Sequence, residues 1–185
     1  MDILQVIKNR RSVMPSQFID KEIEEKYLEM ILDSANWAPT HKKTEPWRFK
    51  VFKEKSKDKL GIFLANKYKE TTEKFSSFRY NKIKSKVNQS NLVIAICIQR
   101  DPNESIPEWE EVASVAMAVQ NMWLYSSSIG IGAYWSSPKL MNFLSDFIKL
   151  SEGERCLGFF YMGYYLEKIK KRVPGSIKDK IKQYN

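Results

Sequence analysis

The chain has 185 residues and a formal net charge of +9, with 43% hydrophobic and 29% charged residues. This balance excludes a disordered chain, and we expect residues 1–185 to form a single domain. Two cysteines and one histidine exclude a disulfide framework and a multi-histidine metal centre. Cys97 and Cys156, distant in the sequence and each in an apolar run, are expected to be small buried residues of a cytoplasmic protein.

The positive charge is concentrated in two segments. Residues 53–89 carry 11 Lys and Arg against 4 Asp and Glu, and residues 167–185 carry 7 against 2. We interpret the first as a Lys-rich helical excursion and the second as a basic C-terminal tail. Such segments suit phosphate-bearing ligands, including nucleic acid, but they are also typical of solvated faces. A basic nucleic-acid-binding protein is therefore an alternative function, although no nucleic-acid motif accompanies the charge and we predict no such partner.

The predicted elements alternate between helices and strands. In chain order they are a helix beginning at an Asp2–Gln5 capping box, a helix from near Asp20 to Pro39, a strand over 47–51, two helices within 56–89, a buried strand over 92–98, a long helix over 108–127, a short strand near 130–135, a helix over 139–147 and a strand over 155–166. This order predicts one α+β or α/β domain in which helices cover a small sheet.

The stretch from Val112 to Pro138 contains no charged residue and is long enough to span a bilayer. Its serines, amides and glycines instead predict a helix buried on all sides in protein, and we predict no membrane partner. Because one domain of this size has limited interior, a second copy of the chain is expected to cover part of the stretch.

Common catalytic motifs are missing from the chain. It has no G-x-S-x-G elbow, no phosphate-binding Walker loop and no dinucleotide fingerprint. His41 is the single histidine, and no nucleophile is placed beside it. Glu110 and Glu111 are adjacent, so on a helix they do not face one site. We therefore predict no catalytic side chain and no metal, and we expect a bound cofactor to supply the reactivity.

Two arginines and a serine, Arg10-Arg11-Ser12, close the first predicted helix. Guanidinium groups and a hydroxyl suit a phosphate monoester, because the planar forks grip its oxygens. Cations at a helix C-terminus also simply complement the helix dipole. The three residues alone leave both interpretations open.

Further motifs follow Arg10-Arg11-Ser12 in a fixed order: Trp37-Ala38-Pro39-Thr40-His41-Lys42, Pro46-Trp47-Arg48-Phe49, Glu108-Trp109-Glu110-Glu111, Gly130 to Ser137, Gly158-Phe159 and Gly163-Tyr164. In this order and spacing the chain resembles the nitroreductase family of FMN-dependent NAD(P)H oxidoreductases, and most of all its short, single-domain bacterial branch. The resemblance extends from Arg10 to about Tyr164.

The resemblance implies an α+β fold with a central, mostly antiparallel sheet flanked by helices. It implies an intertwined homodimer with one FMN at each of two subunit interfaces. The implied reaction transfers hydride from NAD(P)H through flavin N5 to a nitroaromatic, a quinone or a similar small acceptor. Other flavin chemistry on this fold, such as reductive dehalogenation, is an alternative.

The resemblance also assigns roles to residues. The residues expected on the phosphate side of FMN are Arg10, Arg11 and Ser12, and the residues expected to reach the partner's FMN are Trp37 and His41. The flavin is expected to be lined by Trp135, Ser136 and Ser137. The nicotinamide is expected to dock at Tyr125, Ser126, Ser127, Ser128, Ile129 and Gly130.

The chain departs from the family's pattern at three positions where members carry a cation, namely Met14, Trp37 and Ser136. The candidates to replace the missing charge are Lys42, Lys168, Lys170 and Arg172.

Overall fold

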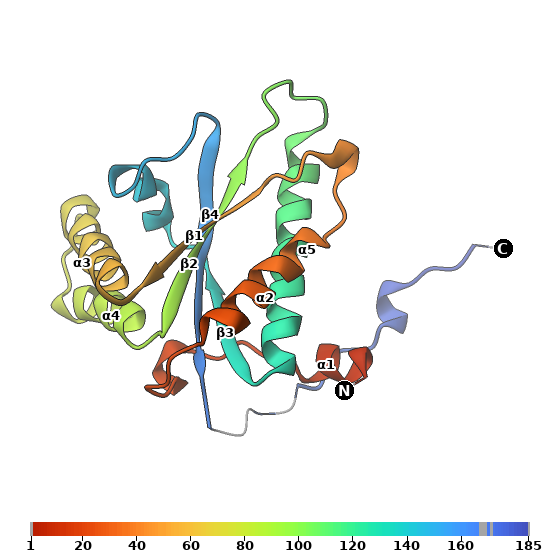
Figure 1. The fold of residues 1–185 in the computed structure, drawn as a ribbon, viewed down its shortest axis with the longest axis horizontal. Helices are drawn as coiled ribbons and strands as arrows, with labels where there is room; N and C mark the ends of the chain where they lie inside the picture. Colours follow the sequence, from red (N-terminus) through yellow and green to blue (C-terminus); the bar gives the residue numbers. More distant parts are fainter. Residues whose placement is uncertain (1, 167–169, 171, 185) are drawn as a thin grey trace.

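The computed structural model describes residues 2–166, 170 and 172–184, and its centre is a four-stranded sheet (Figure 1). The strands are β1 (Trp47–Lys53), β2 (Leu92–Gln99), β3 (Ile131–Ser136) and β4 (Glu154–Tyr164), in the spatial order β1-β2-β4-β3. Every neighbouring pair is antiparallel. The predicted α+β architecture with an antiparallel sheet is therefore confirmed.

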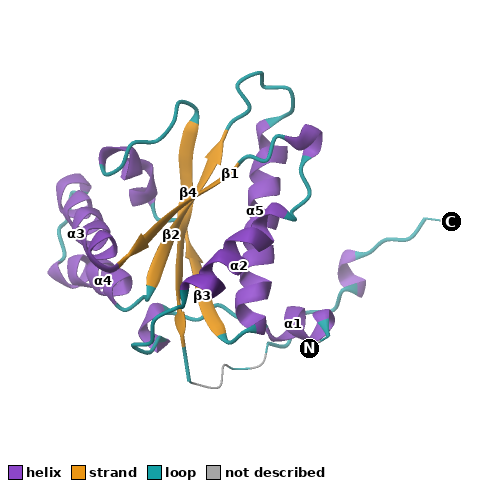
Figure 2. Cartoon of the chain, viewed as in Figure 1, coloured by secondary structure: helices purple, strands orange, loops and turns teal. Residues whose placement is uncertain are grey.

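Strand β2 occupies the middle of the sheet because its side chains are apolar on both faces. Leu92, Ile94, Ile96 and Ile98 belong to one hydrophobic cluster, while Val93, Ala95 and Cys97 belong to the cluster on the opposite face. An unbroken aliphatic run is what a strand covered on both sides requires. The sheet consequently separates two layers of helices (Figure 2).

One face of the sheet packs against α2 (Glu25–Asn36) and α5 (Glu108–Ser128). The other face packs against α3 (Glu54–Thr71), α4 (Ser77–Asn88) and the 3₁₀ segment η3 (Lys139–Asp146). The short helix α1 (Ile3–Asn9) lies beside the C-terminal end of α5 (Figure 1). Three further 3₁₀ turns are η1 (Pro15–Gln17), η2 (His41–Lys43) and η4 (Lys178–Lys180).

Several predicted element boundaries were wrong. The second helix begins at Glu25 and not near Asp20, because the preceding chain pairs with the end of β4, where Ile19 N donates to Tyr164 O at 2.8 Å. Asp2 stands at the N-cap of α1, but its side chain accepts no capping hydrogen bond. The helix expected over 139–147 is the 3₁₀ segment η3, and the strand expected to reach residue 166 ends at Tyr164.

In the single chain the long uncharged helix is only partly buried, and its burial by a second copy stays a prediction. Within the single chain, Ser114, Val115 and Ala118 of α5 are buried, whereas Met117 and Gln120 are exposed. No helix within the described residues is both long and apolar enough to cross a membrane. An uncharged strip of α5 therefore remains open on the surface of one chain.

Cys97 and Cys156 are both buried, as predicted. They are also direct register partners on β2 and β4, a proximity that their distance in the sequence did not indicate. The hydrogen bond between the two sulfurs and the burial of the site raise the pKa of the Cys97 thiol. A neutral, packed thiol is therefore the expected state of Cys97.

Candidate functional site

The segment after α1 is held against β3. The backbone N–H of Val13 donates to Ala133 O at 3.0 Å, and Ser12 forms an isolated parallel bridge with Ala133. Ser12 itself is exposed. The pairing fixes the end of α1 alongside the strand that carries Trp135, so two of the predicted groups of site residues come together.

Three arginines gather at this end of the molecule. The guanidinium of Arg10 is half-buried and lies over the Trp123 ring, 4.6 Å from its centroid. Burial lowers the pKa of Arg10, and the charges of Arg11 and Arg172 lower it further. Among the described residues no carboxylate forms an ion pair with any of the three. A cation cluster of this kind is stabilised by an anion.

Arg11 supports the end of α1, which is one of the two roles that the sequence left open. Its Nη1 donates to Lys8 O and to Arg10 O, both at 2.7 Å, and thereby satisfies carbonyl groups at the end of α1. Its Nε is buried and has no hydrogen-bond partner. The guanidinium therefore supports the helix end through Nη1, while its Nε is enclosed within the chain.

Of the four proposed replacement cations, Arg172 lies within electrostatic reach of Arg10. Lys42 is engaged elsewhere, because its Nζ donates to Ser105 O at 2.9 Å. Lys170 is exposed. Lys168 lies outside the described residues. The structure thus favours Arg172 as the additional cation of the cluster.

The end of β3 presents an aromatic wall followed by two hydroxyls. Trp135 is half-buried, and its indole Nε1 is buried without a hydrogen-bond partner. The ring lies directly over Gly158 of β4, where an added Cβ would be 2.4 Å from Nε1. The hydroxyls of Ser136 and Ser137 form no hydrogen bond among the described residues. The two hydroxyls remain free to meet a ligand, whereas the indole N–H is enclosed against Gly158.

The C-terminal end of α5 contains the residues expected to meet the nicotinamide. Ser126 is fully buried and donates to Met122 O at 2.6 Å, so its hydroxyl is used within the helix. Ser128 is exposed, and its hydroxyl donates to Tyr125 O at 2.7 Å. Ser127 and Ile129 are half-buried, and Gly130 ends the helix with a φ of 79°.

Trp37 follows α2 and is 79% exposed. It lines a cavity of about 390 Å³ together with Tyr125 and Ser128. Among the described residues its side chain forms one long hydrogen bond, from Nε1 to Asp33 Oδ2 at 3.4 Å. The structure therefore brings Trp37 to the predicted nicotinamide segment of its own chain.

His41 lies at the other end of α5, in a loop with unusual backbone angles. Its Nδ1 is 2.6 Å from Glu110 Oε2, and its side chain is 57% exposed. Lys42, Lys43 and Glu45 all have positive φ, a strained conformation that clusters at functional sites. Glu110 was missed as a site residue, because no local pattern pairs it with a histidine 69 positions away.

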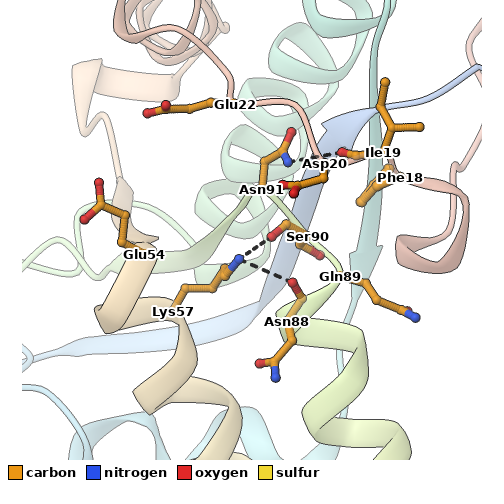
Figure 3. A pocket seen from close by; sticks show the side chains of 10 residues that line it. All are labelled: Phe18, Ile19, Asp20, Glu22, Glu54, Lys57, Asn88, Gln89, Ser90 and Asn91. Atoms are coloured by element: carbon orange, nitrogen blue, oxygen red, sulfur yellow. Dashed lines mark hydrogen bonds between the residues drawn. The ribbon is translucent and has the colours of Figure 1, made fainter.

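A different cavity, of about 450 Å³, contains none of the predicted site residues (Figure 3). Three carboxylates line it, those of Asp20, Glu22 and Glu54. The Lys57 ammonium is already engaged by Ser90 O at 2.6 Å and Asn88 O at 3.4 Å. An acidic lining opposes a phosphate-bearing cofactor. The cation cluster beside β3 is therefore the better candidate site.

Comparison with known proteins identifies the family. The family model described as "Nitroreductase family" matches residues 7–164. The chain belongs to the nitroreductase family. The predicted resemblance is thereby confirmed, and the matched span contains every predicted site residue as well as β1 to β4.

Relatives of this nitroreductase cover nearly the whole chain. The "Putative NAD(P)H nitroreductase YfhC" of Bacillus subtilis is 27% identical over 174 residues, which are 91% of this chain and 88% of that protein. The crystal structure of a nitroreductase-like family protein from Bacillus cereus is 28% identical, with a TM-score of 0.87 over 100% of this chain and 96% of the other.

A nitroreductase with bound FMN from Bacteroides fragilis has a TM-score of 0.71 at 20% identity, over 96% of this chain and 97% of that one. At this identity the likeness concerns the fold. The three comparisons make this chain a nitroreductase-family oxidoreductase with the fold expected of that family.

Proposed function

We propose that this nitroreductase is an FMN-dependent enzyme that oxidises NAD(P)H and reduces nitroaromatic or quinone acceptors. The observation that carries the proposal is the cluster of Arg10, Arg11 and Arg172, which holds three cations and no carboxylate among the described residues. When bound, FMN accepts a hydride from the nicotinamide and delivers electrons to the acceptor.

The residues beside β3 fit the phosphate end of such a cofactor. Arg10 lies half-buried on Trp123, so solvent screens its charge less than on an open surface. The exposed hydroxyl of Ser12 adds a donor, and Arg11 adds a second cation beside Arg10. Charge-assisted hydrogen bonds of this kind are about twice as strong as neutral ones.

The end of β3 fits the ring end of the cofactor. The Trp135 ring forms an apolar wall there, while its indole N–H is enclosed against Gly158 and has no partner among the described residues. Ser136 and Ser137 add hydroxyls that form no hydrogen bond within the part of the chain that the structure describes. These donors orient the flavin and stabilise the negative charge that it gains on reduction. Solvent supplies the protons, since no side chain among the described residues beside β3 is arranged as a dedicated acid or base.

A site shared between two copies explains the positions of His41 and Arg10. His41 contacts Glu110 and Arg10 contacts Trp123, and these two α5 residues are 13 positions apart. At 1.5 Å per residue the separation is about 20 Å. One chain therefore does not bring His41 close to its own arginine cluster, and we assign His41 to the FMN of the partner copy. The assignment of Trp37 to the partner's FMN rests on the family resemblance, because Trp37 lies beside Tyr125 of its own chain.

Exposed apolar surface supports the homodimer. Ile3, Leu4 and Ile7 of α1 and Met117 of α5 are exposed in the single chain. The C-terminal segment runs past α1 and away from the rest of the chain (Figure 1). Its exposed apolar side chains are Val173, Ile177, Ile181 and Tyr184. Surfaces of this kind are typical of obligate dimers, where they become interface.

We expect the purified protein to be yellow, with a non-covalent flavin that heat releases and that mass spectrometry identifies as FMN. The reason is the unpaired arginine cluster, which requires an anion. The rate of NADH or NADPH oxidation is then measured with a nitrobenzene, a benzoquinone or a halophenol as acceptor. The acceptor that gives the fastest rate distinguishes nitroreduction, quinone reduction and reductive dehalogenation. Colourless protein that takes up no FMN on titration contradicts the proposal.

Dimerisation and FMN binding are expected to be coupled, because the proposed site uses Arg10 from one copy and His41 from the other. FMN should tighten the dimer, and the dimer should tighten FMN by the same factor. Sedimentation velocity over a dilution series, with and without FMN, measures both. A stable monomer with full flavin occupancy would exclude the shared site.

A further inference from the structure

A cavity of about 580 Å³ lies on the opposite face of the sheet from α5, over α3, α4 and the turn that joins them. Its lining combines four cations with aromatic and aliphatic groups: Tyr68, Lys74, Ser76, Phe78, Arg79, Lys82, Ile83 and Lys86. The volume is within the range of roughly 300–1,000 Å³ found for small-molecule sites. None of the residues assigned to FMN contributes to it.

The rim of the cavity is held in place by Tyr68, which is buried. The tyrosine hydroxyl accepts from the backbone N–H of Ser76 at 3.1 Å and donates to Lys74 O at 3.4 Å. The Ser76 hydroxyl in turn caps α4 by accepting from Arg79 N at 3.3 Å. The turn that carries Lys74 and the start of the helix that carries Arg79 are thus fixed relative to each other.

The four cations lack carboxylate partners. Among the described residues, no ion pair or side-chain hydrogen bond involves the charged groups of Lys74, Arg79, Lys82 or Lys86. Three of them lie instead over aromatic rings. Arg79 lies over Tyr68 at 5.1 Å, Lys82 lies over Phe78 at 5.9 Å, and Lys86 lies over two tyrosines. The cavity is therefore both cationic and aromatic, without an acidic lining residue.

Lys86 forms the deepest charged group of this cavity. Its Nζ lies between two rings of the sheet, 4.4 Å from the centroid of Tyr134 and 4.5 Å from that of Tyr161. Burial, together with the charge of Lys82, lowers the pKa of Lys86 to about 8. A half-buried ammonium with no counter-ion reduces the stability of the fold, and an apolar side chain at this position would reduce it less.

We propose that this cavity is a second ligand site, which binds a small aromatic anion, an aromatic ring bearing a carboxylate or a phosphate. The anionic group would lie among Lys82, Arg79 and Lys86 and would supply the missing counter-charge. The ring would pack on Phe78 and Ile83. The site lies outside the proposed flavin site, and its existence does not depend on the flavin reaction.

A small ligand fits this surface better than nucleic acid does. The cations converge on one cavity, and Lys86 is partly buried beneath its rim. A phosphate backbone would contact the exposed lysines of α4 in general, including Lys84, which does not line the cavity. A small anion would require Lys82 and Lys86 but not Lys84, and this difference makes the two occupants separable by experiment.

The test is calorimetric titration of the purified full-length protein, in the presence of saturating FMN, with naphthoate. The two control ligands are naphthylmethanol, which has the ring without the charge, and acetate, which has the charge without the ring. We expect naphthoate to bind at least about tenfold more tightly than either, a difference of about 1.4 kcal/mol. Equal binding of naphthoate and naphthylmethanol overturns the proposal.

Variants of α4 locate the site. We expect Lys82→Ala and Lys86→Met each to weaken naphthoate binding about tenfold, the effect of one charged contact. Lys84→Ala removes the same charge from the same helix outside the cavity and should leave binding within about twofold. Lys86→Met should also fold normally, because it replaces an unpaired ammonium by an apolar group of similar length. Unchanged binding in both Lys82→Ala and Lys86→Met overturns the proposal.

Labelling of Lys86 provides a second readout. At pH 8 naphthoate should slow its modification by trinitrobenzenesulfonate, measured by peptide mass spectrometry, because a bound anion favours the unreactive ammonium. Labelling of Lys84 in the same samples should not change. Tighter binding of single-stranded oligothymidylate than of naphthoate, with Lys84→Ala as harmful as Lys82→Ala, would replace the small-anion site by a nucleic-acid surface.

Discussion

Replacement of Arg10 by methionine is expected to raise the dissociation constant for FMN about 10- to 150-fold, the scale of one charged hydrogen bond at about 1.5–3 kcal/mol. The guanidinium is half-buried on Trp123 and has no carboxylate partner among the described residues. Methionine keeps the packing on the indole but removes the charge. Titration of the apoprotein with FMN, followed by flavin fluorescence, measures the effect.

Matched variants separate this role from general electrostatics. Lys8→Met removes an exposed cation from the same helix and should change FMN affinity less than about twofold, because solvent screens it. Arg172→Met should weaken FMN on the same scale as Arg10→Met. Arg11→Met should do so less, since Nη1 of Arg11 already donates to two carbonyl oxygens. An Arg10→Met protein with unaltered FMN affinity would remove the phosphate site from this end of α1.

Gly158→Ala is expected to destabilise the fold by about 2 to 6 kcal/mol and to weaken FMN binding at the same time. Gly158 has a φ of 147°, and an added Cβ would lie 2.4 Å from Trp135 Nε1 and 2.7 Å from the backbone oxygen of Ser136. Backbone strain and crowding each cost about 1 to 3 kcal/mol. The melting temperature should fall by about 4 to 20 °C, and displacement of Trp135 should disturb the flavin wall.

Two other glycines serve as controls for stability. Gly130 has a φ of 79° but nothing within 4 Å of an added Cβ, so Gly130→Ala isolates the backbone strain, about 1 to 3 kcal/mol. Gly175 also has no neighbour within 4 Å and no unusual φ, and Gly175→Ala should leave the melting temperature unchanged. If Gly158→Ala is no less stable than Gly130→Ala, the close contact with Trp135 does not constrain the fold.

Local patterns in the sequence were sufficient for most elements. The aliphatic run of β2 and the uncharged length of α5 predicted a buried strand and a long helix at nearly their observed bounds. They could do so because period and polarity are properties of consecutive residues. The predicted start of the second helix was wrong, because residues after Phe18 pair with β4 and do not join the helix. Local helix propensity does not include this tertiary pairing.

The ordered motifs of the sequence were sufficient to indicate the family, and the family resemblance in turn implied the antiparallel α+β fold that the structure has. The phosphate role of the arginines stays a prediction. Only the tertiary structure decided which distant residues meet. Arg172 approaches Arg10, His41 contacts Glu110, and Cys97 faces Cys156, all across separations that no periodic pattern encodes. It also decided that Lys86 lies over two tyrosines with no counter-ion among the described residues, because the burial of one side chain depends on packing among α4, β3 and β4.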